Sequence, residues 1–140
     1  MNEYRWEDLK VGLAHDFSVV LTEDMLRAFA SLSGDENPLH VDPEHAVKAG
    51  FRGPVAHGLL TSALYSRLVG MYLPGRHALL HGIDVDFVSP AYAGDKLHVS
   101  GEVTFLSEAY FRVEMRARIK NEAGKAISRA KIRVGLHVVA

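Results

Sequence analysis

Two side chains that can transfer protons, Asp35 and His40, lie close together in the segment 33–40, which reads Ser-Gly-Asp-Glu-Asn-Pro-Leu-His. Because a proline follows Asn37, this residue is disfavoured in the α region, and Gly34 tolerates the left-handed geometry that ends a helix. A turn of this kind can aim a carboxylate and an imidazole at one point, where they could share a water molecule or a substrate proton. We therefore predict that 33–40 is a fixed loop that carries chemistry.

Predicted helices lead into and out of this loop. After a short apolar strand at 17–21, Thr22 is typical of an N-cap, and acidic residues followed by apolar residues at helical spacing predict a helix that ends at Gly34. Beyond the loop, Asp42 and the proline after it predict the N-cap and the first position of a short helix over 43–49. The loop is thus expected to be held by helices at both ends.

A long apolar segment follows at about 56–72 and is closed by a Pro-Gly pair. Apolar residues cover most of its circumference as a helix, and Arg67 is its only formally charged side chain. A helix that is apolar nearly all round must be buried. We therefore expect the rest of the chain to wrap it.

The second half of the chain alternates apolar and polar residues, which is the pattern of half-buried strands. The alternating segments are 79–88, 96–106 and the two arms of a long hairpin, 112–120 and 129–138. Such alternation is typical of an antiparallel sheet with one covered face, and the long helix is the apolar element that can cover it. The prediction is one α+β domain over residues 1–140, an antiparallel sheet wrapped around one long buried helix.

Composition sets bounds on function. The 140 residues include 16 Lys and Arg against 17 Asp and Glu, a balance that gives no reason to expect a nucleic acid or an anionic membrane as partner. With no cysteine, the chain has no disulfide, thiolate nucleophile or cysteine-ligated zinc. The charged N-terminus has no apolar leader and no apolar run reaches membrane-spanning length, so we expect a soluble, cytoplasmic protein.

Two motifs resemble the signature of a known family. The segment 33–42, followed by Gly-Pro-Val-Ala-His-Gly at 53–58, is similar to that of the MaoC-like (R)-specific enoyl-CoA hydratases, and 87–90 and 94–95 extend the resemblance over essentially the whole chain. The resemblance implies the hot dog fold and a homodimer whose sheets join edge to edge. It also implies a thioester of coenzyme A or acyl carrier protein as substrate, and no metal or redox cofactor.

The resemblance also assigns roles to residues. It places the catalytic aspartate at Asp35, the catalytic histidine at His40 and the backbone N–H that polarises the substrate carbonyl at Gly58. Asn37 matches the asparagine that braces the loop, and Ser66 matches a serine beside the substrate. In hydration of a trans-2-enoyl thioester, His40 would take a proton from water as it attacks C3, while Asp35 holds that water and passes a proton to C2.

The expected position of the second motif at the start of the long helix suggests roles for Gly58 and His57. Gly58 would lie at the start of the long helix, where unpaired N–H groups favour the negative charge that develops on the thioester oxygen. Its neighbour His57 is interpreted as a packing and hydrogen-bonding residue rather than a catalytic one. A zinc site formed by His40, His45 and His57 is not favoured, because their spacing matches neither a helical His pair nor the zincin pattern.

The last hairpin carries basic side chains on its outward alternation. These residues are Arg112, Arg116, Arg118, Arg129, Lys131 and Arg133. We interpret them as a solvated sheet face, with contact to the phosphates of coenzyme A as the functional alternative. Two alternatives to the hydratase also stay open at this stage, an acyl-CoA thioesterase and a non-catalytic acyl-thioester-binding protein.

Overall fold

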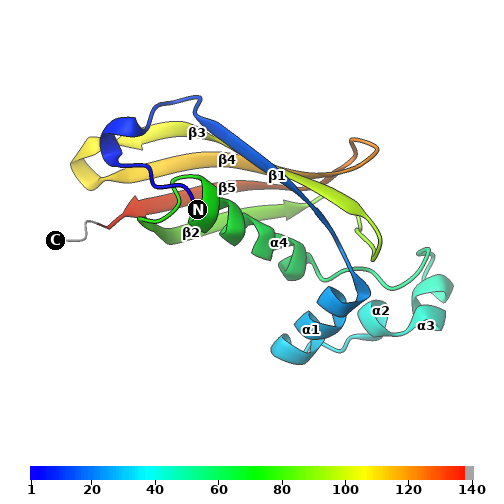
Figure 1. Cartoon of the computed structure of the whole chain (residues 1–140). Coiled ribbons are helices and arrows are strands. Elements are labelled where there is room, and N and C mark those ends of the chain that lie inside the picture. The colour runs from blue at the N-terminus through cyan, green and yellow to red at the C-terminus, as the bar shows by residue number, and fades with distance from the viewer. Residues whose placement is uncertain (138–140) are drawn as a thin grey trace.

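A computed structural model of the chain describes residues 1–137. It contains one five-stranded sheet, one helix lying along a face of that sheet, and three further helices grouped beyond one end of the sheet (Figure 1). The elements are β1 (Ala14–Val20), α1 (Glu23–Ser33), α2 (Pro38–Val41), α3 (Pro43–Lys48), α4 (Gly58–Arg67), a π-helical turn at Leu68–Tyr72, β2 (Ala78–Phe87), β3 (Lys96–Ser107), β4 (Arg112–Asn121) and β5 (Ala126–Leu136), with short 3-10 turns at Trp6–Asp8 and Glu108–Tyr110.

The sheet has the strand order β1-β3-β4-β5-β2, and every neighbouring pair is antiparallel. Inward-facing side chains of β3, β4 and β5 form the core together with residues of α4 and the π-helical turn. The predicted antiparallel sheet around a helix is therefore confirmed. The four strands predicted from alternation are all present, although β5 begins before the predicted 129, and Val138 lies outside the described residues.

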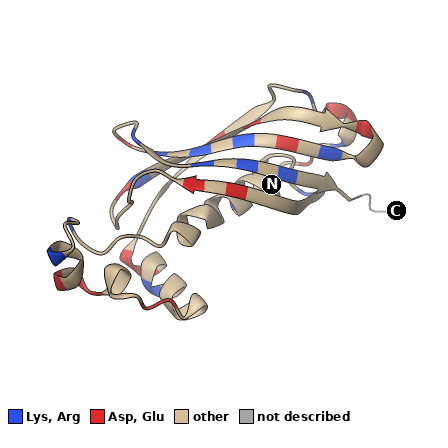
Figure 2. Ribbon diagram, turned by 180° about the vertical axis from the view of Figure 1, so that it is seen from behind, with Lys and Arg blue, Asp and Glu red and all other residues tan. Residues whose placement is uncertain are grey.

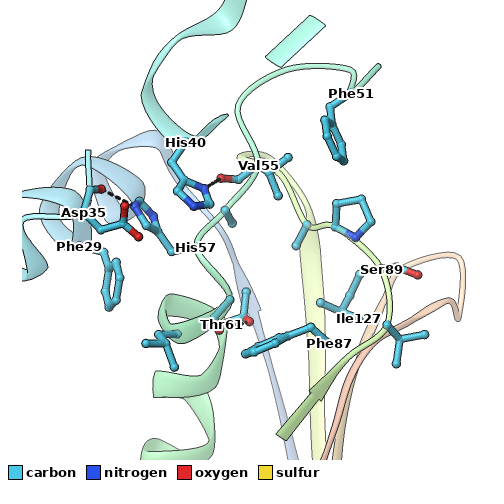
Figure 3. Close-up of a pocket in the computed structure, with 16 residues that line it drawn as sticks. Phe29, Asp35, His40, Phe51, Val55, His57, Thr61, Phe87, Ser89 and Ile127 are labelled. Carbon is cyan, nitrogen blue, oxygen red and sulfur yellow. Dashed lines mark hydrogen bonds between the residues drawn. The ribbon is translucent and has the colours of Figure 1, made fainter. Parts of the chain in front are cut away.

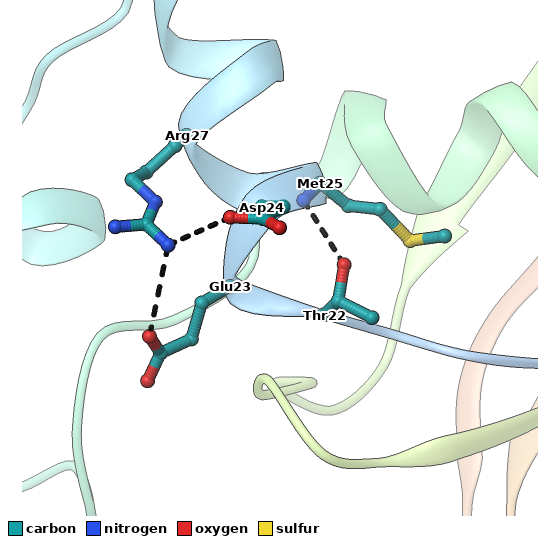
Figure 4. Close-up of polar contacts among 5 residues, drawn as sticks. All are labelled: Thr22, Glu23, Asp24, Met25 and Arg27. Atoms are coloured by element: carbon teal, nitrogen blue, oxygen red, sulfur yellow. Dashed lines mark hydrogen bonds and ion pairs between the residues drawn. The ribbon is translucent and has the colours of Figure 1, made fainter.

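Helix α1 begins and ends where the sequence predicts. The Thr22 hydroxyl accepts a hydrogen bond from the Met25 backbone N–H at 3.1 Å (Figure 4). The Arg27 guanidinium lies 2.7 Å from the Asp24 carboxylate in the first turn, and the glycine at position 34 ends the helix with a φ of 74°. These local interactions fix the direction in which the chain leaves α1 and enters the segment that carries Asp35.

Helix α4 departs from its prediction in two ways. It starts at Gly58 rather than near 56, because His57 has extended backbone geometry as the N-cap. It is also not buried all round, since Leu59 is 68% exposed and Met71, in the π-helical turn, is 44% exposed. The sheet covers only one side of the helix, so one apolar face of α4 remains open in the single chain.

In the described part of the chain, residues 1–137, no helix is both long enough and apolar enough to cross a membrane.

Candidate active site

A pocket of about 450 Å³ lies where the N-terminus of α4 meets the segment after α1 and the ends of β2 and β5. Its wall is mostly apolar and includes Phe29, Phe51, Phe87 and Ile127. Three ionisable side chains lie close together, as Figure 3 shows: the Asp35 carboxylate and the imidazoles of His40 and His57. Gly58 lines the same pocket. The structure thus brings together the three predicted catalytic groups, which come from two separate motifs.

Asp35 is positioned through its backbone on both sides. Its N–H donates to the Ser33 hydroxyl at 3.1 Å, and its carbonyl oxygen accepts from Nε2 of His57 at 2.8 Å. One carboxylate oxygen, Oδ1, accepts from the Asn37 N–H at 3.2 Å. The other carboxylate oxygen has no protein donor among residues 1–137, so it is available to a ligand.

His40 lies on a helix that the sequence analysis missed. The segment Pro38–Val41 forms the single-turn helix α2, not a loop, with Asn37 as its N-cap and proline at its first position. The Asn37 side chain accepts from the Leu39 N–H at 3.0 Å. The physical reason is that a proline at the first helical position has its φ preset and loses no hydrogen bond, so Asn-Pro starts a helix here.

The contacts of His40 decide which of its nitrogens can act as a base. The ring nitrogen Nδ1 lies 2.6 Å from the Val55 carbonyl oxygen, which can only accept, so Nδ1 carries the proton. In the neutral ring, Nε2 is then the nitrogen with the free lone pair. The Val55 N–H donates in turn to the Leu39 carbonyl at 3.0 Å, so α2 is fixed to the connector before α4.

His57 contacts both residues whose side chains are predicted to be catalytic, Asp35 and His40. Its ring is 2% exposed and stacks on the ring of His40, with centroids 3.9 Å apart and planes 25° apart. Its Nε2 donates to the Asp35 carbonyl, so Nδ1 carries the lone pair in the neutral ring, and this buried atom has no partner among the described residues. The interpretation of His57 as a packing and hydrogen-bonding residue agrees with this geometry. Its contact with Asp35 and His40 was not predicted, and the only signal for it was its place at a buried helix start.

The donor atoms of Asp35, His40 and His57 lie within 4.8 Å of one another, which raises the question of a metal ion. Two of the four ring nitrogens are already engaged by backbone carbonyls. The free lone pairs of two stacked imidazoles lie in nearly parallel planes, so they do not converge on one ion at the roughly 2.1 Å that zinc requires. The donor set therefore fits proton transfer better than metal binding.

Gly58 is the first residue of α4, so its N–H is one of the helix-start donors without an intrahelical partner. Among residues 1–137 no group outside the helix accepts a hydrogen bond from this N–H either. A Cβ at this position would lie 2.8 Å from Cε1 of Phe87, closer than side chains pack. Glycine therefore allows the Phe87 ring to close the pocket directly over the helix start.

The chain matches the family model described as a MaoC like domain over residues 10–125. The protein belongs to the MaoC-like family. The resemblance drawn from the sequence motifs is therefore confirmed.

Relatives and solved structures agree with this assignment. The chain is 36% identical over 118 residues, 84% of this chain and 88% of the relative, to an (R)-specific enoyl-CoA hydratase of Aeromonas caviae. It is 35% identical over 101 residues, 72% of this chain and 64% of the relative, to a 3-hydroxybutyryl-CoA dehydratase of Methylorubrum extorquens.

The solved (R)-hydratase of A. caviae superposes with a TM-score of 0.89 at 34% identity, covering 94% of this chain and 99% of that one. An unliganded R-hydratase of Pseudomonas aeruginosa gives a TM-score of 0.88 at 31% identity, with 96% and 90% covered. The predicted hot dog fold and the assignment to the hydratases and dehydratases are confirmed.

Asn37 and Ser66, the two supporting residues that we predicted at the substrate-binding site from the resemblance, do not line this pocket. Asn37 is exposed and acts as the N-cap of α2, which agrees with its expected bracing role. Ser66 is exposed near the end of α4. The structure of one chain does not bring Ser66 to the pocket, so its contact with substrate stays a prediction.

The basic residues of the β4–β5 hairpin lie on the outward side of the sheet, as predicted (Figure 2). Arg133 pairs with Asp84 at 3.0 Å and Arg112 with Glu114 at 3.1 Å. None of the six residues lines the pocket, and the sheet face that they occupy is turned away from α4. The interpretation as a solvated face agrees with this placement, and contact with coenzyme A phosphates stays a prediction.

Proposed function

We propose that this MaoC-like protein adds water to trans-2-enoyl thioesters of coenzyme A or acyl carrier protein to give (R)-3-hydroxyacyl thioesters, and catalyses the reverse dehydration. The observation that carries the proposal is the convergence of the Asp35 carboxylate, the His40 imidazole and the Gly58 N–H on one apolar pocket. The names of the relatives support it, because they include both (R)-specific hydratases and dehydratases.

The three groups divide the reaction between them. The Gly58 N–H, at the positive end of α4, donates to the thioester oxygen and stabilises the charge of the enolate. Nε2 of His40 takes one proton of the water as the oxygen bonds to C3, and the free Asp35 oxygen holds that water. Asp35 relays the proton taken by His40 to C2, and the second proton of the water stays on the new hydroxyl group at C3. Both side chains therefore end the cycle as they began, and the net change is addition of one water.

The apolar wall gives this arrangement its strength. Phe29, Phe51 and Phe87 line the pocket beside the polar groups, and a hydrogen bond to a developing charge is worth more where apolar side chains surround it. His57 adds a second support, since it holds the Asp35 peptide and packs against the base. The site is thus arranged to stabilise negative charge on the thioester oxygen and to bind one water molecule.

The test is hydration of crotonyl-CoA with chiral analysis of the product. We expect loss of the enoyl thioester, formation of the (R)-3-hydroxy product and no release of free coenzyme A. Release of the thiol without hydration would indicate a thioesterase instead. Recovery of the (S) isomer would contradict the placement of water between Asp35 and His40.

We further propose that the protein is a homodimer joined through β2 and the open face of α4. β2 is an edge strand that pairs only with β5 in the described chain, and an unpaired edge invites another strand. Leu79 and Phe87 are 54% and 53% exposed along it, and Val88, which follows the strand, is 47% exposed. Leu59 extends the apolar surface onto α4. Exposed apolar patches of this kind mark protein interfaces.

Light scattering should therefore give twice the monomer mass of 15.4 kDa. Leu79→Glu should shift the protein toward the monomer, because it places a charge in the proposed interface. Leu32→Glu is the matched control, since Leu32 is 86% exposed on α1, away from β2. A wild-type protein that runs as a monomer, or a dimer that both variants leave intact, would contradict this interface.

A further inference from the structure

The inner end of the pocket lies along one face of α4. Gly58, Thr61 and Tyr65 follow one another at intervals of three and four residues, so their side chains lie on the same side of the helix. Gly58 and Thr61 line the pocket, whereas Tyr65 is 1% exposed and does not. Helical side chains lean toward the N-terminus, so the Tyr65 ring is directed toward Thr61 and the pocket.

A bulge in β5 forms the opposite wall. Ile119 pairs with Ser128 and Lys120 with Ala126, which leaves Ile127 as an extra residue between them. Consecutive strand residues normally face opposite sides, but here both Ile127 and Ser128 are buried. Ile127 lines the pocket beside Phe87 and near Thr61 (Figure 3), and Ser128 is the next residue along the strand.

Tyr65 and Ser128 are joined across this space. The Tyr65 hydroxyl lies 2.8 Å from Oγ of Ser128, and the two side chains are 1% and 0% exposed. Burial raises the pKa of the Tyr65 hydroxyl, and the hydrogen bond from Ser128 offsets only part of this effect, so the pair stays neutral. Two buried hydroxyl groups that satisfy each other hold the ring in one position between α4 and β5.

We propose that Tyr65, held by Ser128, closes the acyl pocket and restricts the enzyme to short enoyl groups. The inference rests on the proposed function and identifies its substrate class. An acyl chain that starts at the Gly58 N–H and runs between α4 and β5 passes Thr61 and Ile127 and then meets the Tyr65 ring. Seven helical residues separate Gly58 from Tyr65, about 10 Å along the axis, and the ring occupies the far part of that length.

The test compares kcat/KM for crotonyl-CoA and trans-2-octenoyl-CoA. We expect the wild type to prefer crotonyl-CoA by about tenfold or more, because added methylenes without room are rejected on this scale. Tyr65→Ala should raise the octenoyl-to-crotonyl ratio by about tenfold or more by opening the closed end. Tyr65→Phe is the matched control, since it keeps the ring and removes only the hydroxyl, and it should keep the short-chain preference.

The outcomes separate this inference from the proposed function. A wild type that uses both substrates equally, or a ratio that Tyr65→Ala leaves unchanged, overturns the inference while hydration itself stands. If neither substrate is hydrated, the proposed function fails.

Inhibition of the wild type by saturated thioesters tests the depth of the pocket without any variant. The test therefore remains valid even if Tyr65→Ala does not fold. Butyryl-CoA should bind at least about tenfold more tightly than octanoyl-CoA. Equal binding of the two thioesters would overturn the inference.

Discussion

Replacing His40 by alanine should lower kcat/KM for crotonyl-CoA by about 10²–10⁴-fold, the usual contribution of a positioned general base. The expectation rests on one contact: Nδ1 donates to the Val55 carbonyl at 2.6 Å, which leaves Nε2 with its lone pair free. Steady-state kinetics measure this loss, and a wild-type kcat/KM in His40→Ala would contradict an imidazole base.

The matched control is His45→Ala. His45 is an exposed histidine on α3 that does not line the pocket, so its loss should leave kcat/KM unchanged. Asp35→Asn tests the second group with little change of shape, because an asparagine oxygen can still accept from the Asn37 N–H at the position of Oδ1. Asp35→Asn should lower kcat/KM by a factor similar to that of His40→Ala. Wild-type rates in both Asp35→Asn and His40→Ala would end the catalytic assignment.

The location of Asp35, one of the two proposed catalytic residues, could be predicted from the sequence because it depends on local rules. Thr22 caps the start of α1, and Gly34 ends the helix with a left-handed backbone. These two residues fix where the chain leaves the helix, and therefore where Asp35 lies. Helix α2 was missed although its rule is also local. Asn37 followed by proline satisfies both a turn and a helix start, and a single turn of helix has too few residues to show a period.

Other features depend on contacts between distant segments and could not be read from the sequence. The stacking of His57 on His40 joins the start of α4 to α2, and nothing in the spacing of the two residues specifies it. The bulge that turns both Ile127 and Ser128 inward interrupts the very alternation used to predict strands. The open face with Leu59 shows that an apolar pattern indicates burial but not which partner provides it.

Gly58→Ala should lower kcat by about 10²–10³-fold, as much as the removal of one oxyanion donor. Alanine suits the backbone at this helix start, so the loss should come from packing. Its Cβ would lie 2.8 Å from Cε1 of Phe87, and either the ring or the helix start must move. A shift of the helix start displaces the N–H that faces the thioester oxygen. Gly70→Ala is the matched control, because a Cβ at Gly70 meets no atom within 4 Å.

A second substitution distinguishes this cause from a general disturbance of the fold. Phe87 is 53% exposed, so Phe87→Ala removes the obstructing ring at modest cost to the core. If the ring causes the loss, the double variant Gly58→Ala with Phe87→Ala should recover about tenfold or more relative to Gly58→Ala alone, since contacting residues couple on this scale. The single variant Phe87→Ala calibrates the effect of opening the pocket wall. Additive losses in the cycle would show that Phe87 is not the obstacle, and a Gly58→Ala enzyme with wild-type kcat would remove the Gly58 N–H from the mechanism.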